Sequence, residues 1–310
     1  LVQSFLGTDS KKFVEVPVYP LGLVYLGSQL YQKHKVNILD LNVLDDPYNE
    51  LKNSIEKDSP EIVGVSFRNI KLADPSGKYL SCLEALEKVL KFIKKVKSDI
   101  KIIIGGPAFS LYAAHIMERF SEIDFGIFSE GEESFPELLN HLDQPDKVKG
   151  LFFRSNGGVN FTGYRGWMSF DRSPSPRRDL IEIQRYFGKP YTVGVQTKRG
   201  CILECIHCCD RYLLGNSLRL RSPEAIVAEI EDLVINHNTK SIHFVDQIFN
   251  IPLKHAQEIC EEIIRRKISV EWTAWFNEKY ITEEFLLTAQ KAGCNLINFS
   301  PDSTSDVVLK

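Results

Sequence analysis

Long apolar runs are missing from this chain, and so are several signatures of common ligand sites. No apolar stretch in the 310 residues approaches the roughly 18 residues that a transmembrane helix needs, so we expect no membrane span. The net charge of −3 is not that of a nucleic-acid-binding surface, which is usually strongly basic. Neither a G-x-G-x-x-G motif nor a Walker loop occurs, so a dinucleotide or a nucleoside triphosphate is poorly supported as a ligand.

Paired cysteines are scarce as well. The chain holds seven cysteines, an odd number, and has no second C-x2-C pair. A framework of disulfides and a zinc site built from two such pairs are therefore not expected. Several thiols crowded together indicate a reducing compartment, and we expect a cytoplasmic protein.

The remaining composition is that of an ordinary globular protein. Apolar residues make up 43% of the chain and charged residues 25%. The length allows about two domains with a sizeable core. Because the chain begins with Leu1 and its last segment looks unfinished, we expect a piece of a longer protein.

Three cysteines are concentrated in one short segment. Cys201, Cys205 and Cys208 have the spacing C-x3-C-x2-C and follow an apolar stretch. Clusters of four iron atoms are usually held by four thiolates. Three thiolates would leave one iron open to another ligand, much as a catalytic zinc keeps one position free. The alternatives are inert thiols, or a zinc site whose fourth ligand is Cys209, His207 or His243.

The first half of the chain alternates short apolar runs with amphipathic stretches, which predicts a parallel sheet covered by helices. Apolar residues at helical spacing predict a helix over Tyr79–Lys97, with Cys82 packed in its core. The predicted strands are Val36–Leu41, Ile62–Phe67, Lys101–Ile104 and Asp124–Phe128.

The second half repeats the alternation of strand and helix. Ser222 and Thr282 are predicted helix N-caps, because each precedes an acidic first turn. The predicted strands are Tyr191–Thr197, Ser241–Asp246, Ser269–Phe276 and Asn295–Ser300. We therefore expect an α/β domain over residues 1–150, a hairpin end and linker over 151–190, and a second domain over 191–310.

Three loops at the ends of the first-half strands carry residues that suit a ligand. Parallel sheets bind ligands at the carboxyl ends of their strands. Glycine there lets a ligand approach the backbone closely, although a tight turn of the chain is the simpler role for it. The candidate residues are Ser66, Gly105, Gly106, Pro107, Glu130, Gly131 and Glu132.

The cysteine spacing resembles the signature of the radical S-adenosylmethionine (SAM) superfamily. The flanking segments Gln196–Gly200 and Arg219–Pro223 resemble the branch of that superfamily that binds B12. In the first half, the order of Pro20–Leu26, Asp40 and the three loops is similar to the cobalamin-binding domain of the same branch. The resemblance extends from residue 17 to about residue 300.

This resemblance implies an N-terminal Rossmann-like parallel sheet of the cobalamin-binding type. A partial (β/α)6 radical SAM barrel, truncated at its C-terminus, would follow. The three loops would hold cobalamin. Because no D-x-H-x-x-G motif occurs, cobalamin would be bound without its own base and without a histidine on cobalt.

The resemblance also implies ligands in the second half. Cys201, Cys205 and Cys208 would bind a [4Fe–4S] cluster, whose open iron binds the amine and the carboxylate of SAM. Other residues are placed near SAM by the same resemblance: His207, Asp246 and Asp302. The alternatives are that Asp246 caps the helix that follows it and that His207 is a solvated loop residue.

The implied activity is cleavage of SAM to a 5′-deoxyadenosyl radical, followed most commonly by cobalamin-dependent methylation of an unactivated carbon. A cyclase or rearrangement enzyme of the same kind, and a non-catalytic metal-binding module, are the alternatives. The substrate, a small molecule or a peptide, is not identified, and a flavodoxin- or ferredoxin-type electron donor is the expected partner. A methylthiotransferase would need cysteines for a second cluster, but Cys82 is the only cysteine before Cys201.

The last predicted strand, Asn295–Ser300, would be an exposed edge, which favours aggregation. We also expect the apolar faces of the final helices, including Phe285, Leu286 and Ala289, to lack the packing partners that further β/α units would provide.

Overall fold

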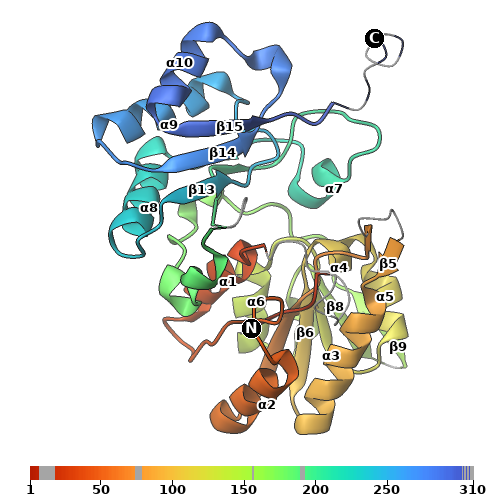
Figure 1. Ribbon diagram of the computed structural model, residues 1–310. Coiled ribbons are helices and arrows are strands. Elements are labelled where there is room, and N and C mark those ends of the chain that lie inside the picture. The colour runs from red at the N-terminus through yellow and green to blue at the C-terminus, as the bar shows by residue number, and fades with distance from the viewer. Residues whose placement is uncertain are drawn as a thin grey trace. The chain divides into compact units, whose positions relative to one another are not determined.

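The computed structural model describes residues 1–6, 18–73, 79–155, 157–188, 193–301, 303, 305 and 307. The chain divides into two compact units (Figure 1). The first unit contains Leu1–Met168 and Ser173–Arg185, and the second contains Ser169–Arg172 and Tyr186–Lys310. The segment predicted as a linker therefore contributes residues to both units.

The first unit is built on a seven-stranded sheet in which five neighbouring strands run parallel and the last two strands are each joined by antiparallel pairing. The strand order reverses beside β1, which has β2 on one side and β3 on the other, so this position is a topological switch point. The strands in spatial order are β2 (Leu39–Asp40), β1 (Val2–Gln3), β3 (Ile62–Ser66), β6 (Lys101–Gly105), β7 (Phe125–Ile127), β8 (Leu151–Ser155) and β9 (Gly158–Phe161).

The predicted helix over Tyr79–Lys97 is wrong in its first turn. Residues Tyr79–Ser81 form the strand β5, which pairs antiparallel with β4 (Lys71–Ala73). The helix begins only at Leu83, with Cys82 as its buried N-cap residue. Pairing with β4 therefore determines the structure of residues 79–81, although apolar residues at helical spacing extend through them.

Helices cover both faces of the sheet. Ile102 and Ile104 of β6 lie in one core cluster and Ile103 lies in the other, because successive side chains of a strand point to opposite faces. The helices against the first cluster are α2 (Pro47–Asp58), α3 (Leu83–Val96), α4 (Pro107–Leu111) and α5 (Ala113–Arg119), and those against the second are α1 (Leu21–Leu30) and α6 (Gly131–Asn140).

The second unit contains a four-stranded parallel sheet in chain order, as the alternating pattern predicts. Its strands are β10 (Gly194–Val195), β13 (Ser241–Phe244), β14 (Glu271–Trp275) and β15 (Cys294–Asn298), and its helices are α7 (Asp210–Leu214), α8 (Pro223–Ile235), α9 (Leu253–Arg265) and α10 (Glu283–Lys291). Figure 1 shows α7 beside the carboxyl ends of β13, β14 and β15. The cap predictions are confirmed, because the Ser222 and Thr282 side chains accept hydrogen bonds from the N–H groups of Ala225 and Phe285.

Short elements complete the described structure. A two-stranded antiparallel ladder joins β11 (Lys198–Arg199) to β12 (Arg219–Leu220). The 3-10 helices are Pro145–Lys147, Phe170–Arg172, Arg178–Leu180, Ile183–Tyr186 and Glu278–Tyr280. No helix in the described ranges is both long and apolar enough to cross a membrane.

Aromatic rings form the core of the second unit. The ring centroids of Phe244 and Phe249 lie 4.5 Å apart, and Trp272 lies 5.1 Å from both. Phe276 in turn contacts Phe285 of α10, at 6.1 Å. The expectation that Phe285 lacks packing partners is therefore wrong, since its side chain is 1% exposed.

Replacing Phe285 with alanine is expected to lower the free energy of unfolding of the second unit by about 3–5 kcal/mol, because the loss of a buried ring leaves a cavity. The matched control is Leu287→Ala on the same helix, where the side chain is 51% exposed. It should change the free energy by no more than about 0.5 kcal/mol. Urea unfolding followed by tryptophan fluorescence measures both, and equal effects would contradict the packing described.

Candidate functional site

The three cysteines lie in a loop that is closed at its base. We call residues 200–218, between β11 and β12, the cysteine loop. The ladder places Lys198 opposite Leu220 and Arg199 opposite Arg219, so the two ends of the loop lie side by side. The loop is thereby attached to the second unit through a narrow neck.

Glycine is required at this neck. Gly200 has a φ of +92°, and a Cβ atom there would lie 2.0 Å from the carbonyl oxygen of Ser217. The next residue, Cys201, donates its N–H to the carbonyl oxygen of Gly215 at 3.0 Å. Because only glycine permits this close passage of two chain segments, Gly200 determines where the first cysteine leaves the neck.

The three thiols differ in exposure. Cys201 is half-buried, whereas Cys205 and Cys208 are exposed. Burial raises the pKa of the Cys201 thiol. A hydrogen bond from the backbone N–H of Leu203 to the sulfur partly lowers that pKa again. Burial likewise raises the pKa of Cys208, whose Sγ accepts the N–H of Asp210 at 3.5 Å.

The donor chemistry of the loop fits an iron–sulfur cluster. Two of the three sulfurs accept backbone N–H groups, and hydrogen bonds of this kind tune cluster sulfurs in proteins. Among the described residues, however, no three His, Cys, Asp or Glu side chains converge closely enough to hold a metal ion. The structure thus places the cysteines on one loop without directing their thiols to a single point.

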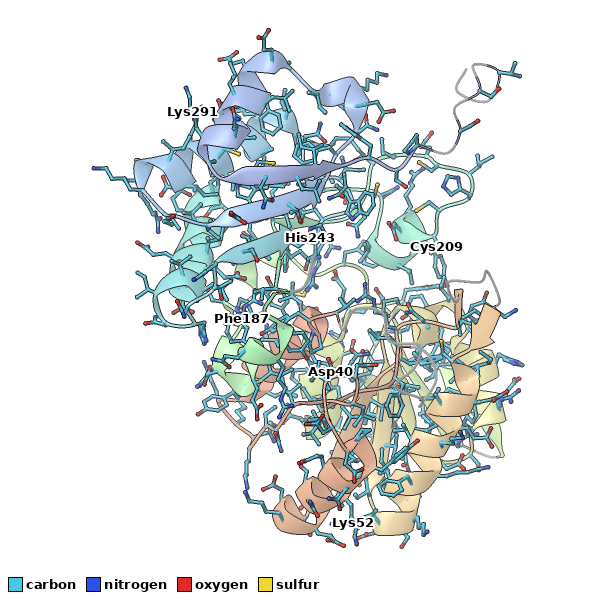
Figure 2. All side chains as sticks on the ribbon, in the orientation of Figure 1. Asp40, Lys52, Phe187, Cys209, His243 and Lys291 are labelled. Atoms are coloured by element: carbon cyan, nitrogen blue, oxygen red, sulfur yellow. The ribbon has the colours of Figure 1, made fainter. Side chains whose placement is uncertain are left out.

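The proposed fourth ligands of a zinc site lie in different settings. Cys209 is exposed and precedes α7, whereas His243 is buried within β13 (Figure 2). The Nδ1 atom of His243 lies 2.7 Å from the Oγ1 atom of Thr273, and burial lowers the pKa of the imidazole to about 4. His243 is therefore engaged inside the sheet as a neutral group.

Asp246 has a different environment from the one a helix cap would have. The N-cap of the following helix, α9, is Pro252. The carboxylate of Asp246 instead accepts the N–H of Thr197 at 2.8 Å, the N–H of Lys198 at 3.2 Å and the Lys198 ammonium at 3.1 Å. The hydroxyl of Thr197 donates to the same carboxylate. The side chain is thus occupied at the base of the cysteine loop.

The other residues predicted near SAM are less informative. His207 is exposed in a turn of the cysteine loop, between two of the cysteines. Asp302 lies outside the described residues. A role of His207, Asp246 or Asp302 in SAM binding stays a prediction.

The three loops of the first unit lie next to one another at the carboxyl edge of its sheet. Ser66 and Gly105 are register partners at the ends of β3 and β6. The Ser110 hydroxyl donates to the carbonyl oxygen of Gly106 at 3.1 Å and accepts the N–H of Ser129 at 2.8 Å. This hydroxyl joins the loop after β6 to the loop after β7, so the structure brings the predicted segments together.

The two adjacent glycines of this edge have different roles. Gly106 has a φ of +102°, and a Cβ atom there would lie 2.7 Å from the carbonyl oxygen of Phe67. At Gly105 the nearest atom to such a Cβ would be the Ile127 oxygen at 3.6 Å, an ordinary contact. The turn of the chain therefore requires glycine at 106 but not at 105.

The acidic loop is mostly engaged in the fold. Glu130 is the N-cap residue of α6, and its carboxylate accepts the N–H of Met168 at 3.1 Å. Gly131 begins the helix and Glu132 is buried in its first turn. Pro107, the first residue of α4, is exposed.

Sequence reasoning missed several residues that organise these two places. Ser110 and Ser129 carry no pattern that distinguishes them from other loop serines. Thr197 and Lys198 lie in the segment before the first cysteine, but nothing local indicates that Lys198 is buried. The one available signal is that Lys198 and Asp246 each lie at or just after the end of a predicted strand of the same parallel sheet, which could have indicated an ion pair between them.

Comparison with known proteins covers both units. The family described as the B12 binding domain matches residues 13–139. The radical SAM superfamily matches residues 195–310. The two matches have the order that the resemblance implies.

Curated relatives include a methyltransferase and a cyclase. The chain is 28% identical over 306 residues to an uncharacterised methyltransferase of Pyrococcus horikoshii, covering 97% of this chain and 64% of the relative. It is 24% identical over 270 residues to the anaerobic magnesium-protoporphyrin IX monomethyl ester cyclase of Rubrivivax gelatinosus, covering 82% of this chain and 46% of that enzyme. The chain thus spans about half to two thirds of the length of these relatives.

A solved structure confirms the fold. It is that of the radical SAM methyltransferase TsrM from Kitasatospora setae, with cobalamin and a [4Fe-4S] cluster bound. The TM-score is 0.85 at 22% identity, and the match covers 99% of this chain and 61% of the other. The predicted order of a cobalamin-binding-type sheet and a radical SAM fold is therefore correct.

Alanine at positions 105 and 106 should separate the two glycine roles. Gly106→Ala is expected to lower the free energy of unfolding of the first unit by about 1–3 kcal/mol, because its backbone conformation is open essentially to glycine alone. Gly105→Ala is the matched control and should unfold at nearly the wild-type urea concentration. A Gly105 variant as unstable as the Gly106 variant would show that the space described at residue 105 is wrong.

Proposed function

We propose that this protein, which belongs to the radical SAM enzymes that carry a B12-binding domain, methylates an unactivated carbon of its substrate. The observation that carries this proposal is the combination of two features in one chain. A three-cysteine loop follows the first strand of a parallel sheet, and a B12-type sheet presents three adjacent loops at its carboxyl edge. The cofactors of such a chain are a [4Fe–4S] cluster, SAM and cobalamin.

Cys201, Cys205 and Cys208 are the residues that we propose as cluster ligands. Thiolates are the usual protein ligands of such clusters, and this loop presents three of them between its closed ends. The N–H groups of Leu203 and Asp210 would favour the charged form of two of the sulfurs. Exposure of Cys205 and Cys208 leaves their side chains free to turn toward a common point.

The carboxyl edge of the first sheet is the proposed cobalamin site. Gly105 is the residue that most directly supports this, because the fold itself leaves room for a Cβ atom there. A bulky, flat ligand lying across Ser66 and the loop after β6 would need that space. Gly106 would contribute indirectly, by allowing the turn that begins α4.

When bound, the cluster supplies the electron that cleaves SAM, and cobalamin carries the methyl group. The residues of this chain would hold these groups in place and exclude water. We propose an external electron donor of the flavodoxin or ferredoxin type, and a cytoplasmic location. Neither the Pyrococcus methyltransferase nor the Rubrivivax cyclase identifies the substrate of this chain.

Replacement of Cys201, Cys205 or Cys208 by alanine is expected to abolish most cluster binding, because the two thiolates left cannot hold four iron atoms. Iron and sulfide are assayed after anaerobic reconstitution, and the cluster is followed by visible absorption and electron paramagnetic resonance with and without SAM. Cys209→Ala is the matched control, since this thiol is exposed and adjacent but outside the motif. Cys260→Ala and Cys294→Ala should likewise retain the cluster.

Full cluster content in any of the three motif variants would show that the ligand assignment is wrong. Tight zinc binding with no iron after reconstitution would instead support a non-catalytic metal-binding module. Cobalamin uptake is measured on the same preparation, where Gly105→Ala should weaken it. An unchanged affinity in that variant would contradict the position proposed for cobalamin.

A cyclase is the second candidate function, favoured by the similarity to the Rubrivivax enzyme. The two functions leave different products of SAM. Methyl transfer leaves S-adenosylhomocysteine, and hydrogen abstraction leaves 5′-deoxyadenosine. Protein loaded with both cofactors and a reductant should form both products if it methylates unactivated carbon, whereas 5′-deoxyadenosine alone would favour the cyclase.

A further inference from the structure

Two buried ion pairs lie at the base of the cysteine loop, one on each of its arms. The rising arm is residues 196–199, which lead into Gly200. The returning arm is residues 219–221, which lead from the loop into α8. Lys198 pairs with Asp246 at 3.1 Å and Arg221 pairs with Glu229 at 2.7 Å.

The pair on the rising arm is almost completely removed from solvent. The side chains of Lys198 and Asp246 are 2% and 0% exposed. The Lys198 ammonium also donates to the carbonyl oxygen of Phe249 at 2.9 Å and to the Thr197 hydroxyl at 3.1 Å. Each charge is therefore buried and makes hydrogen bonds to several polar groups, whose positions fix its orientation.

The Asp246 carboxylate joins separate parts of the second unit. Asp246 follows β13, whereas Thr197 and Lys198 follow β10, the neighbouring strand. Its two oxygens accept two backbone N–H groups as well as the Thr197 hydroxyl and the Lys198 ammonium. The carboxylate thus holds both the backbone and the side chains of the rising arm, three residues before Cys201.

The pair on the returning arm is fastened to the same segment. Arg221 donates its backbone N–H to the carbonyl oxygen of Thr197 at 3.0 Å and its Nη1 to that of Gln196 at 2.9 Å. The carbonyl oxygen of Arg221 lies 2.8 Å from Nε2 of His255 in α9. The two arms are therefore held to each other and to the sheet and helices behind them.

Net stability alone does not explain such a cluster of charges. A buried ion pair is often no more stabilising than apolar residues of the same volume, because both charges lose their hydration. An ion pair with several directed hydrogen bonds instead restricts the chain segments that carry it to a single position. A cofactor site needs its ligands held within about 0.5 Å, which apolar packing around a two-residue ladder does not guarantee.

We infer that Lys198 and Asp246 are positioning residues for the cluster site. Their ion pair holds the rising arm against β13, and this fixes the place from which Cys201 leaves the neck. Neither residue supplies a thiolate, and the Asp246 carboxylate acts on the loop through its contacts with Thr197 and Lys198. This inference rests on the proposed function, because it concerns the ligands of the proposed cluster.

The decisive variant removes both charges at once. Asp246→Asn alone would leave the Lys198 cation buried without a counter-charge, which strongly destabilises the fold and endangers folding. The double variant Lys198→Met with Asp246→Asn leaves no unpaired charge and keeps the side-chain volumes. It is compared with Glu262→Gln, which removes a charge from the ion pairs with Arg265 and Arg266 at the C-terminal end of α9.

The full chain is reconstituted anaerobically, and three properties are measured. They are the unfolding temperature, the rate of iron loss to a chelator, and the electron paramagnetic resonance spectrum of the reduced cluster. We expect the double variant to unfold near the wild-type temperature, yet to lose iron about 10- to 100-fold faster, as removal of residues that orient metal ligands typically does. Its spectrum should broaden, while Glu262→Gln should match the wild type in iron loss and spectrum.

A double variant with wild-type iron loss and spectrum would overturn the inference, whatever its unfolding temperature. If the double variant does not fold, Thr197→Val decides the question, because it removes one hydroxyl from the carboxylate and little volume. That variant should accelerate iron loss by a smaller factor, and an unchanged rate and spectrum would overturn the inference. A wild-type protein that takes up no cluster would instead contradict the proposed function.

Discussion

The buried carboxylate of Asp246 is the interaction on which the functional end of the second unit depends. An ionised carboxylate in the interior must be surrounded by donors, and here the donors come from the segment that precedes the cysteines. The need to satisfy one charge thereby joins the ends of two neighbouring strands. The ladder of β11 and β12, the glycine neck and the returning arm with Arg221 all rest on that junction. The cysteine loop has little regular structure of its own apart from α7.

Both units carry their candidate ligand-binding loops at the carboxyl ends of parallel strands, but the loops differ in what they present. Each has a parallel sheet whose strand ends gather loops at one edge. In the first unit the edge is shaped by the backbone, with a glycine that permits the turn at 106 and a small residue at 105 that leaves space. In the second unit the loop extends far beyond the strand end and carries thiols. A broad organic ligand requires room near the backbone, whereas metal atoms require side-chain donors.

Sequence reasoning recovered the parts of the fold that depend on runs of apolar residues. β3, β6 and the strands of the second sheet lie within or close to their predicted ranges, and the three cysteines are found on one loop. The strand β1, second from the edge of the first sheet, was missed because Val2–Gln3 is too short to show a period. The start of α3 was misplaced because β5 is determined by its partner strand. The pair of Lys198 and Asp246 escaped notice because its members are 48 residues apart and meet only through sheet pairing.

The closed neck of the cysteine loop has a consequence for how such proteins diversify. Because residues 198–199 and 219–220 are paired and Gly200 closes the neck, the residues between the cysteines can change in composition without moving either end of the loop. Ile206, whose side chain is fully exposed between two of the cysteines, has no packing role in the sheet behind it. Substitutions there are nearly neutral for folding. An ancestral scaffold could therefore acquire new reactivities at this loop while its core remained unchanged.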